Sequence, residues 1–504
     1  MTTVIIPTVG IGSRMQTVTP ALNKALLLYK NKPILAHIID QFPTDTKFLI
    51  PVGYLSQQII DFCQLAYADR NIEFIPIEWK GDYCGTGYTL SQCASKITGP
   101  FWYVACDTYF EELLPDLSED CYFVREVNNP SLFTMFKVVD ERTADIVFKT
   151  DTPLDWVAFT GLMYIQRHVE FFDRLRNLPD TKEFIPALEI GCKVAPLNSW
   201  LDFGNPEVYL AALKKSQAFD FTKKNEVTYI CNKRVIKWWA DNIVATKKMH
   251  KVDHKTNIWP ANCAAQSNWF AYDYFPGHTL YESSDPMLFT NLLRILDARL
   301  WVKTQQNIVS DVDNFYRVKT LARIDQFKAK YPDLPKSMTV NGVLVDESII
   351  QDINWNTVTE NIVATKMHGD LQFDNIVVDS HGDFKLIDWR QEFGTNTIYG
   401  DVYYDLAKLA GGLLINYAKV KQGQLSLTST ENTILYTLPS MDNVDTYMNI
   451  LYSYAISKQY NLDKIKLLVP IIFLNMAPLH TAPFDQILWY HGLKTLHETI
   501  LQPK

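Results

Sequence analysis

The chain has 504 residues, too many for one hydrophobic core, so we expect two or three domains. Its composition, 47% apolar and 21% charged residues, is typical of a soluble globular protein and argues against a disordered or fibrous chain. The net charge of −8 argues against non-specific nucleic-acid binding, which needs a basic surface.

No apolar run reaches the ~18 residues that a membrane span requires, and no signal-peptide pattern opens the sequence. The eight cysteines are scattered without a CxxC pair, which is typical of reduced, buried thiols in a cytosolic protein. We therefore expect a cytoplasmic protein without a membrane span. The sequence leaves the oligomeric state open, a homo-oligomer included.

Residues 1–215 alternate short apolar runs with amphipathic segments. The pattern predicts buried strands at 4–6, 47–52, 72–77 and 101–106, with helices at 32–42, 55–68 and 87–97. Such alternation indicates an α/β fold, a Rossmann-like parallel sheet covered by helices on both faces. Ligands of such sheets bind at the carboxyl ends of the strands.

The alternation breaks into a polar, lysine-rich stretch at 214–225, directly after a helix expected at 206–216. We place the domain boundary there, so that 1–218 form one domain and 226–504 a second. Within the second domain, 226–282 are strand-like and mixed, and 283–504 are mainly helical. This pattern predicts a small lobe followed by a larger helical lobe.

Several short pieces of the first domain carry residues suited to nucleotides. The loop Gly10-Ile-Gly-Ser-Arg14 follows a strand, where its backbone N–H groups can approach a triphosphate and Arg14 can add a charged fork. Lys24, Gly85-Thr-Gly87, Asp107 at the end of a strand and Asp202 follow in that order.

In order and spacing these pieces resemble the nucleotidyltransferases with a GT-A-like fold, which act on sugar phosphates and alcohol phosphates such as phosphocholine. The resemblance covers roughly residues 1–215. It implies that a nucleoside triphosphate is bound by Gly10, Gly12, Ser13 and Arg14 and that its base lies near Gly85, Thr86 and Gly87. It also implies that Lys24 and Lys149 contact the reacting phosphates and that Asp107 and Asp202 share Mg²⁺. Pro7-Thr8 departs from the family's usual residues before the loop, which leaves the base open.

The chemistry needs these residue types. A phosphate monoester attacks the α-phosphorus of a nucleotide, so two anions must be brought together. A divalent metal and lysines can offset that repulsion.

A second constellation is His368-Gly-Asp370-Leu-Gln-Phe-Asp-Asn375, followed by Asp388 after a short apolar strand. Asp370 can accept a proton from a substrate hydroxyl. Asn375 and Asp388 can hold Mg²⁺ against the phosphates of ATP. This is the layout of a phosphoryl-transfer site.

The constellation resembles the aminoglycoside phosphotransferase and choline kinase superfamily over about 226–410, with Gly369 where protein kinases have arginine. The resemblance implies an α+β, two-lobed, protein-kinase-like domain in which Lys237 grips the ATP phosphates. Two features depart from the pattern, since 221–226 hold no glycine-rich loop and no glutamate follows to pair with Lys237. The aromatic and apolar stripes of the helical tail, 411–504, favour core packing, and the alternative is that Trp489, Tyr490 or nearby aromatics form a cage for a quaternary ammonium.

The leading hypothesis is a bifunctional, Mg²⁺-dependent enzyme, a small-molecule kinase joined to a nucleotidyltransferase. It would phosphorylate a small alcohol with ATP and transfer a nucleotidyl group, best CMP from CTP, to the phosphomonoester. Choline is the favoured alcohol, and the product would serve capsule or other surface decoration. The alternatives are a sugar kinase fused to a sugar-1-phosphate nucleotidyltransferase, and a nucleotidyltransferase with a non-catalytic kinase-like module. An antibiotic-modifying phosphotransferase would leave the first domain unexplained.

Overall fold

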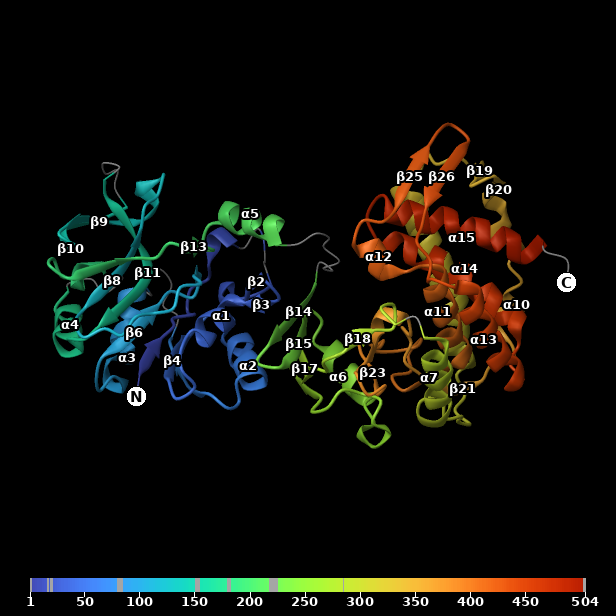
Figure 1. The fold of residues 1–504 in the computed structure, drawn as a ribbon, viewed down its shortest axis with the longest axis horizontal. Helices are drawn as coiled ribbons and strands as arrows, with labels where there is room; N and C mark the ends of the chain where they lie inside the picture. Colours follow the sequence, from blue (N-terminus) through green and yellow to red (C-terminus); the bar gives the residue numbers. More distant parts are fainter. Residues whose placement is uncertain are drawn as a thin grey trace. The chain divides into compact units, whose positions relative to one another are not determined.

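A computed structural model describes residues 2–15, 18, 21–78, 85–149, 155–178, 183–216, 225–283 and 285–501 (Figure 1). The chain divides into two compact units. The first is Met1–Asp241 with Gln266–Ala271, and the second is Asn242–Ala265 with Tyr272–Lys504. In the part of the chain described, no helix is long and apolar enough to cross a membrane.

The first unit is built on one nine-stranded sheet with the order β5-β4-β1-β6-β11-β8-β12-β10-β9. Its first four strands are parallel and match the strands expected from the sequence. They are β1 (Thr3–Ile5), β4 (Lys47–Val52), β5 (Asn71–Pro76) and β6 (Phe101–Val104). The helices between them also lie close to their expected positions, at α1 (Ile34–Asp40), α2 (Ser56–Ala66) and α3 (Thr86–Cys93).

The other half of this sheet is mixed, so the expectation of a parallel sheet holds only for β1, β4, β5 and β6. Its strands are β8 (Cys121–Arg125), β9 (Thr134–Val139), β10 (Arg142–Phe148), β11 (Val157–Ile165) and β12 (Lys193–Pro196). β11 runs antiparallel to β6, β8 and β9, while β12 is parallel to β8. A tight turn with positive φ at Asp140 and Glu141 joins β9 to β10, and such a turn reverses the strand where a helix would have kept it parallel.

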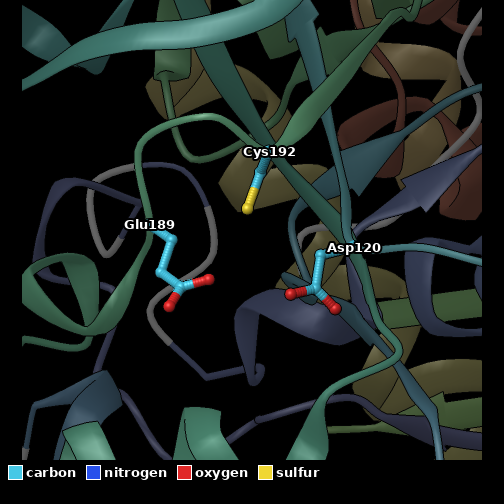
Figure 2. Close-up of side chains that lie close together, drawn as sticks. All are labelled: Asp120, Glu189 and Cys192. Carbon is cyan, nitrogen blue, oxygen red and sulfur yellow. The ribbon is translucent and has the colours of Figure 1, made fainter.

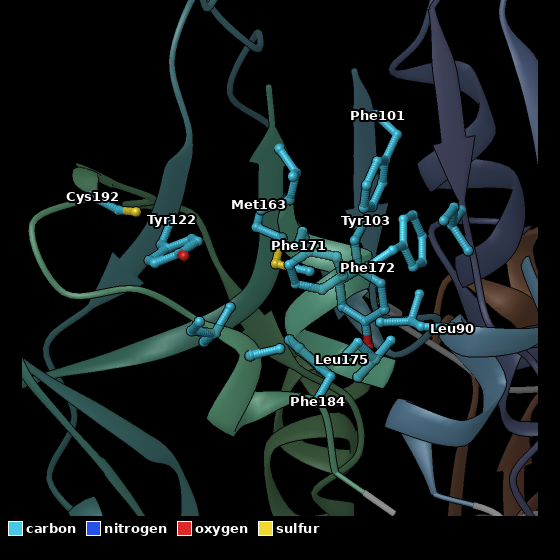
Figure 3. Packing of buried hydrophobic residues seen from close by; sticks show 14 of the residues in the cluster. Leu90, Phe101, Tyr103, Tyr122, Met163, Phe171, Phe172, Leu175, Phe184 and Cys192 are labelled. Atoms are coloured by element: carbon cyan, nitrogen blue, oxygen red, sulfur yellow. The ribbon is translucent and has the colours of Figure 1, made fainter. Parts of the chain in front are cut away.

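The core of the first unit lies where the parallel and mixed halves of the sheet meet (Figure 3). Phe101 on β6 stacks on Phe172 of α4 (His168–Arg176), with ring centroids 5.5 Å apart. Tyr103 and Met163 are buried beside them. This packing holds β6 in place, and β6 leads directly into Asp107.

Strands β14 (Glu226–Cys231) and β15 (Arg234–Trp239) belong to the first unit, which therefore extends beyond the boundary expected at 218–226. Tyr229 Oη donates to the Leu26 carbonyl oxygen, Ile230 N–H donates to Asn31 O at 2.7 Å, and Asn232 Nδ2 donates to Ala66 O at 2.7 Å. These hydrogen bonds attach the hairpin to the first unit. α5 (Pro206–Ser216) also belongs to this unit, whereas β16 (Ala264–Gln266) and β17 (Trp269–Asp273) each have residues in both units.

The second unit is largely helical, as expected. Its longer helices are α6 (Ile243–His250), α7 (Pro286–Arg299), α9 (Lys319–Lys330), α11 (Val402–Leu414), α13 (Val444–Ser457), α14 (Leu462–Met476) and α15 (Phe484–Leu501). α14 packs against α15, α11 and α9. The short α8 (Val309–Asp313) passes into α9 through a π-helical turn, Asn314–Val318.

The second unit also contains a four-stranded sheet that the sequence did not predict. Its order is β20-β19-β26-β25, with β19 (Ser337–Val340), β20 (Val343–Asp346), β25 (Ser426–Ser429) and β26 (Thr433–Thr437). These strands are only four or five residues long, so the apolar periodicity over each is too short to distinguish a strand from a loop or a helix segment. Near the candidate site described below, β22 (Ile376–Val378) pairs with β23 (Phe384–Leu386).

Candidate active sites

The first candidate site forms around Lys24, which begins a short 3₁₀ turn, Lys24–Leu26. Lys24 Nζ lies 2.8 Å from Asp107 Oδ2, and both side chains are mostly buried. The preceding residue, Asn23, is buried and holds the turn in place. Its Nδ2 donates to Thr8 O at 3.0 Å and to Tyr54 O at 2.8 Å. Asn23 is a positioning residue that the sequence reasoning missed.

Asp107 and Asp202 approach each other because their strands pair. β7 (Thr108–Tyr109) is antiparallel to β13 (Leu201–Asp202), with Asp202 opposite Thr108. At Gly204, an added Cβ would lie 2.8 Å from Asp107 Oδ2 and 2.9 Å from Asp202 Oδ1. The two carboxylates therefore converge on one point, and only a glycine leaves them room there.

The charges at this point are not balanced. Burial favours neutral Asp107, but the neighbouring Lys24 ammonium prevails and lowers the pKa of Asp107. Asp107 in turn overcomes the effect of burial on Lys24 and raises its pKa. Burial and then the Asp107 charge raise the pKa of Asp202 to about 6. Two carboxylates that share one lysine suit a divalent cation such as Mg²⁺, which binds through oxygen ligands.

The glycine loop lies over Lys24. Gly12 has a φ of +63°, and a Cβ there would lie 3.1 Å from Lys24 Cδ, so the close approach requires glycine. Ser13 and Arg14 follow in a 3₁₀ turn and are exposed. The Arg14 charge favours the ionised forms of Asp107 and Asp202. Gly10 has open space around it.

Among the described residues, the remaining predicted residues of the first site form no hydrogen bond or ion pair with Lys24 or the two carboxylates. Lys149 is exposed and its Nζ lies 4.8 Å from the Phe148 ring centroid. Among the described residues it forms no ion pair with Asp107 or Asp202. Thr86 and Gly87 begin α3, and Gly85 O accepts a hydrogen bond from Thr89 N at 3.1 Å.

A separate cluster of possible metal ligands, Asp120, Glu189 and Cys192, lies elsewhere in the first unit (Figure 2). Its carboxylates are already neutralised. Arg167 Nη2 lies 2.8 Å from Asp120 Oδ2 and also pairs with Glu189, and Arg174 Nη1 lies 2.6 Å from Glu189 Oε1. This cluster is an ion-pair network that ties β8 and α4 together, and it was not singled out from the sequence.

The second candidate site is a loop held by Asp405 of α11. Asp405 is fully buried and accepts hydrogen bonds from His368 N at 2.9 Å, Gly369 N at 2.7 Å and Trp301 Nε1 at 3.1 Å. The His368 ring accepts from Asp370 N at 3.2 Å and lies 2.9 Å from Ile387 O, which identifies the neutral form with the proton on Nε2. Burial lowers its pKa to about 3, in agreement.

Asp370 is oriented by two neighbours. Lys408 Nζ of α11 lies 2.7 Å from Asp370 Oδ1, and Asn375 Nδ2 donates to Asp370 O at 2.9 Å. Burial would favour neutral Asp370, but Lys408 prevails and lowers its pKa. Asp370 is therefore a carboxylate near neutral pH, able to accept a hydrogen bond from a hydroxyl group. The contact between Lys408 and Asp370 was not predicted from the sequence.

Asp388 and Asn375 lie on connected backbone, since Ile387 N donates to Asn375 O at 2.9 Å. Asp388 is in the left-handed region with a φ of +56°, and its side chain is partly exposed. The Asn375 side-chain oxygen accepts no hydrogen bond from the residues that the structure describes. One carboxylate and one amide oxygen fit the ligand preference of Mg²⁺.

The lysine beside Asp388 within the second unit is Lys248 on α6, whose Nζ lies 3.5 Å from Asp388 Oδ1 and bonds Trp389 O. The sequence reasoning missed it. Lys237 is buried on β15 of the first unit, opposite Thr228. Trp489 and Tyr490 are both buried, and Trp489 stacks on Phe327 with centroids 4.5 Å apart. Both are core residues, in agreement with the packing role predicted for the helical tail, and neither is exposed to bind an ammonium group. Residues 221–224, where no glycine-rich loop was found, lie outside the described residues.

The known proteins that resemble this chain match its N-terminal part. No family model matches. The chain is 30% identical over 132 residues to the bifunctional protein GlmU of Methanococcus vannielii, covering 26% of this chain and 30% of that protein. It is 25% identical over 247 residues to the mannose-1-phosphate guanyltransferase of Gibberella zeae, covering 43% and 66%. The chain thus spans less than two thirds of the length of these relatives.

Among solved structures, the CTP:phosphocholine cytidylyltransferase of Streptococcus pneumoniae is 18% identical, with 43% of this chain and 99% of that chain covered and a TM-score of 0.35. The inositol-1-phosphate CTP transferase of T. maritima is 16% identical, with 42% and 96% covered and a TM-score of 0.34. The N-terminal part of the chain resembles nucleotidyltransferases in sequence.

Proposed function

We propose that the first unit transfers a nucleotidyl group from a nucleoside triphosphate to a phosphate monoester. A monoester oxygen attacks the α-phosphorus, a new P–O bond forms, the bond to the bridging oxygen breaks and pyrophosphate leaves. The observation that carries this proposal is the convergence of Asp107 and Asp202 on Gly204 beside Lys24. The name of the Gibberella zeae relative, a mannose-1-phosphate guanyltransferase, describes a reaction of this type.

Each residue then has a role. Lys24 offsets the negative charge of the reacting phosphates, and the Gly10–Arg14 loop binds the triphosphate through backbone N–H groups and the Arg14 guanidinium. Gly85, Thr86 and Gly87 border the base, and Lys149 binds the incoming phosphate. Mg²⁺, when bound at Asp107 and Asp202, supplies charge neutralisation between the two anions. CTP is the nucleotide we propose, and a sugar-1-phosphate nucleotidyltransferase is the alternative.

For the second unit we propose phosphoryl transfer from ATP to a small alcohol. Asp370 accepts the hydroxyl proton as the oxygen attacks the γ-phosphorus, and ADP leaves. Asn375 and Asp388 would hold Mg²⁺, whose charge stabilises the phosphates. Lys237, the phosphate-binding lysine predicted from the sequence, lies on β15 of the first unit and is not part of this proposal. The Lys408–Asp370 ion pair supports this over a non-catalytic module, because a buried lysine keeps the proton acceptor ionised.

Together the two reactions are consecutive: the monoester made at Asp370 is the substrate at Lys24. The product, a nucleotide-activated alcohol or sugar, is the form used to decorate capsules and other surface polymers. Choline and hexoses are the two acceptors that the sequence puts forward.

The test is a product screen with the purified chain and Mg²⁺. Pyrophosphate release is measured for CTP, UTP, GTP and dTTP, each with phosphocholine, glycerol 3-phosphate and hexose 1-phosphates. Phosphomonoester formation from ATP is measured with the corresponding alcohols. The proposal expects both reactions. Absence of pyrophosphate release with every pair would refute the first assignment, and absence of any monoester would refute the second.

A further inference from the structure

Beside Asp370 the second unit carries a group of basic side chains that form no ion pair with a described carboxylate. Lys319 Nζ lies 3.8 Å from the centroid of the Phe315 ring, and Arg390 Cζ lies 5.1 Å from the same centroid. Two basic groups therefore contact one aromatic ring. Arg323, one turn along α9 from Lys319, uses Nη1 to donate to Asn475 O at 2.9 Å.

The acids nearby are already engaged. Asp370 is paired with Lys408, and Glu392 with Lys247. Among the described residues, Lys319, Arg323 and Arg390 form no ion pair. The Arg390 Nε is buried and has no hydrogen-bond partner there. A buried guanidinium N–H without an acceptor is costly, which indicates an acceptor that arrives with a ligand.

The electrostatics place these cations close to one another and to Asp370. Burial, then the charges of Arg390, Arg323 and Lys408, lower the pKa of Lys319 to about 6, while Asp370 opposes the change. Burial and Arg390 also lower the pKa of Arg323. Arg390 acts on Asp370 as well. Arg390 N donates to His368 O at 3.0 Å, so the cluster lies beside the loop that carries Asp370.

We propose that Lys319, Arg323 and Arg390 bind a negative group on the alcohol that is phosphorylated at Asp370. This inference rests on the proposed phosphoryl transfer and specifies its substrate class. The acceptor is an alcohol that carries its own carboxylate or phosphate group. A quaternary ammonium such as choline meets repulsion from Arg323 and Arg390 and finds no cage at Trp489 or Tyr490, which are buried in the core.

The alternative role of the cluster is to bind the phosphate group that ATP transfers. The two roles are distinguished by which KM a substitution in the cluster raises, that of the alcohol or that of ATP. If the cations bind the acceptor, Arg323→Gln raises the KM of the alcohol and leaves the KM of ATP unchanged. Loss of one charge-assisted hydrogen bond predicts roughly a ten- to hundred-fold rise.

The experiment compares D-glycerate, glycerol 3-phosphate, choline and glucose as acceptors with ATP and Mg²⁺, using the wild type, Arg323→Gln and Arg317→Gln. Arg317 is the matched control, because it is an exposed arginine six residues before Arg323 in the sequence. Its Nη2 lies 2.8 Å from Asp313 Oδ2, so it already has an acidic partner. The proposal expects an anionic acceptor to be preferred at least ten-fold, with the preference lost only in Arg323→Gln. Preference for choline or glucose, or an ATP KM that rises instead, would overturn it.

Binding gives a readout that does not depend on turnover. D-glycerate, glycerol 3-phosphate and choline are titrated calorimetrically into Asp370→Asn with and without Arg323→Gln. If an anionic probe binds more tightly than choline and Arg323→Gln weakens that binding, the anion site is supported. This holds even if no alcohol is phosphorylated, and in that case only the phosphoryl-transfer proposal fails. If neither anionic probe binds more tightly than choline, the anion site is wrong.

Discussion

Replacing Gly204 with alanine should separate the two carboxylates of the first site without removing either charge. The added Cβ would lie 2.8 Å from Asp107 Oδ2 and 2.9 Å from Asp202 Oδ1, whereas ordinary contact begins at 3.4 Å. Both oxygens must therefore retreat by about half an ångström. Gly204 has no positive φ, so alanine strains the site and not the backbone.

The magnitude follows from how steeply catalysis depends on position. A displacement of about 1 Å can cost ~10²-fold, so about half of that predicts a ten- to hundred-fold loss, or about 1.4–2.7 kcal/mol of transition-state stabilisation. The Mg²⁺ concentration for half-maximal rate should rise as well, because the metal ligands are those displaced. Phosphoryl transfer by the second unit should not change.

The assay is pyrophosphate release at varied Mg²⁺, with the nucleotide and monoester pair that the product screen identifies. Gly99→Ala is the matched control, since a Cβ at Gly99 meets nothing within 4 Å and its φ is not positive. Wild-type kcat/KM and Mg²⁺ dependence in Gly204→Ala would refute the shared-metal interpretation. An equal loss in Gly99→Ala would attribute the effect to glycine replacement in general.

Three further predictions follow from buried charges. Burial and Asp107 raise the pKa of Asp202 from 3.8 to about 6, so its ionisation destabilises the folded protein progressively as the pH rises from about 4 to 6. Asp202→Asn should therefore stabilise the metal-free protein by about 3 kcal/mol at pH 8 and by less than about 1 kcal/mol at pH 4, as urea unfolding with EDTA would show. An equal gain at both pH values would contradict this. Asp405→Ala leaves three N–H groups without their acceptor and should lower the unfolding free energy of the second unit by about 3 kcal/mol. A loss of less than about 0.5 kcal/mol would show that Asp405 is dispensable for stability. The pKa of Lys319 is lowered to about 6, so its amine is mostly neutral at pH 7.5, and a bound anion should raise that pKa and cause Lys319 to take up a proton. Calorimetry of glycerate binding in buffers of different ionisation enthalpy would measure this proton uptake. No uptake would count against Lys319 as a ligand of the anion.

More of the first site than of the second could be predicted from the sequence, because its residues follow strands of the parallel sheet. Asp107 follows a buried strand of the parallel sheet, and the ends of such strands meet at one edge. Gly12 and Lys24 lie at the same edge, so their order in the sequence already indicated proximity. Lys149 follows the β9–β10 hairpin, in the mixed half of the sheet, and its placement could not be derived from a parallel pattern.

At the second site the local motif was predictable, but its charged surroundings were not. Asp370 and Asn375 are five residues apart, and their hydrogen bond is local. Lys408 and Arg323 come from helices α11 and α9, which are distant in sequence, and only the packing of those helices on α14 decides their neighbours. A lone arginine on an amphipathic helix such as α9 is usually a solvated residue, so no pattern distinguished Arg323.

The central claim, two independent reactions on one chain, is tested most directly by complementation. Asp107→Asn and Asp370→Asn are assayed separately and as a mixture, starting from the alcohol, ATP and CTP, with ³¹P NMR of the products. We predict that Asp107→Asn accumulates the phosphomonoester, that Asp370→Asn forms the nucleotide-linked product only from supplied monoester, and that the mixture makes the final product from the alcohol. If either single replacement abolishes both reactions while the protein stays folded, or if the mixture makes no final product, the two-site account is contradicted.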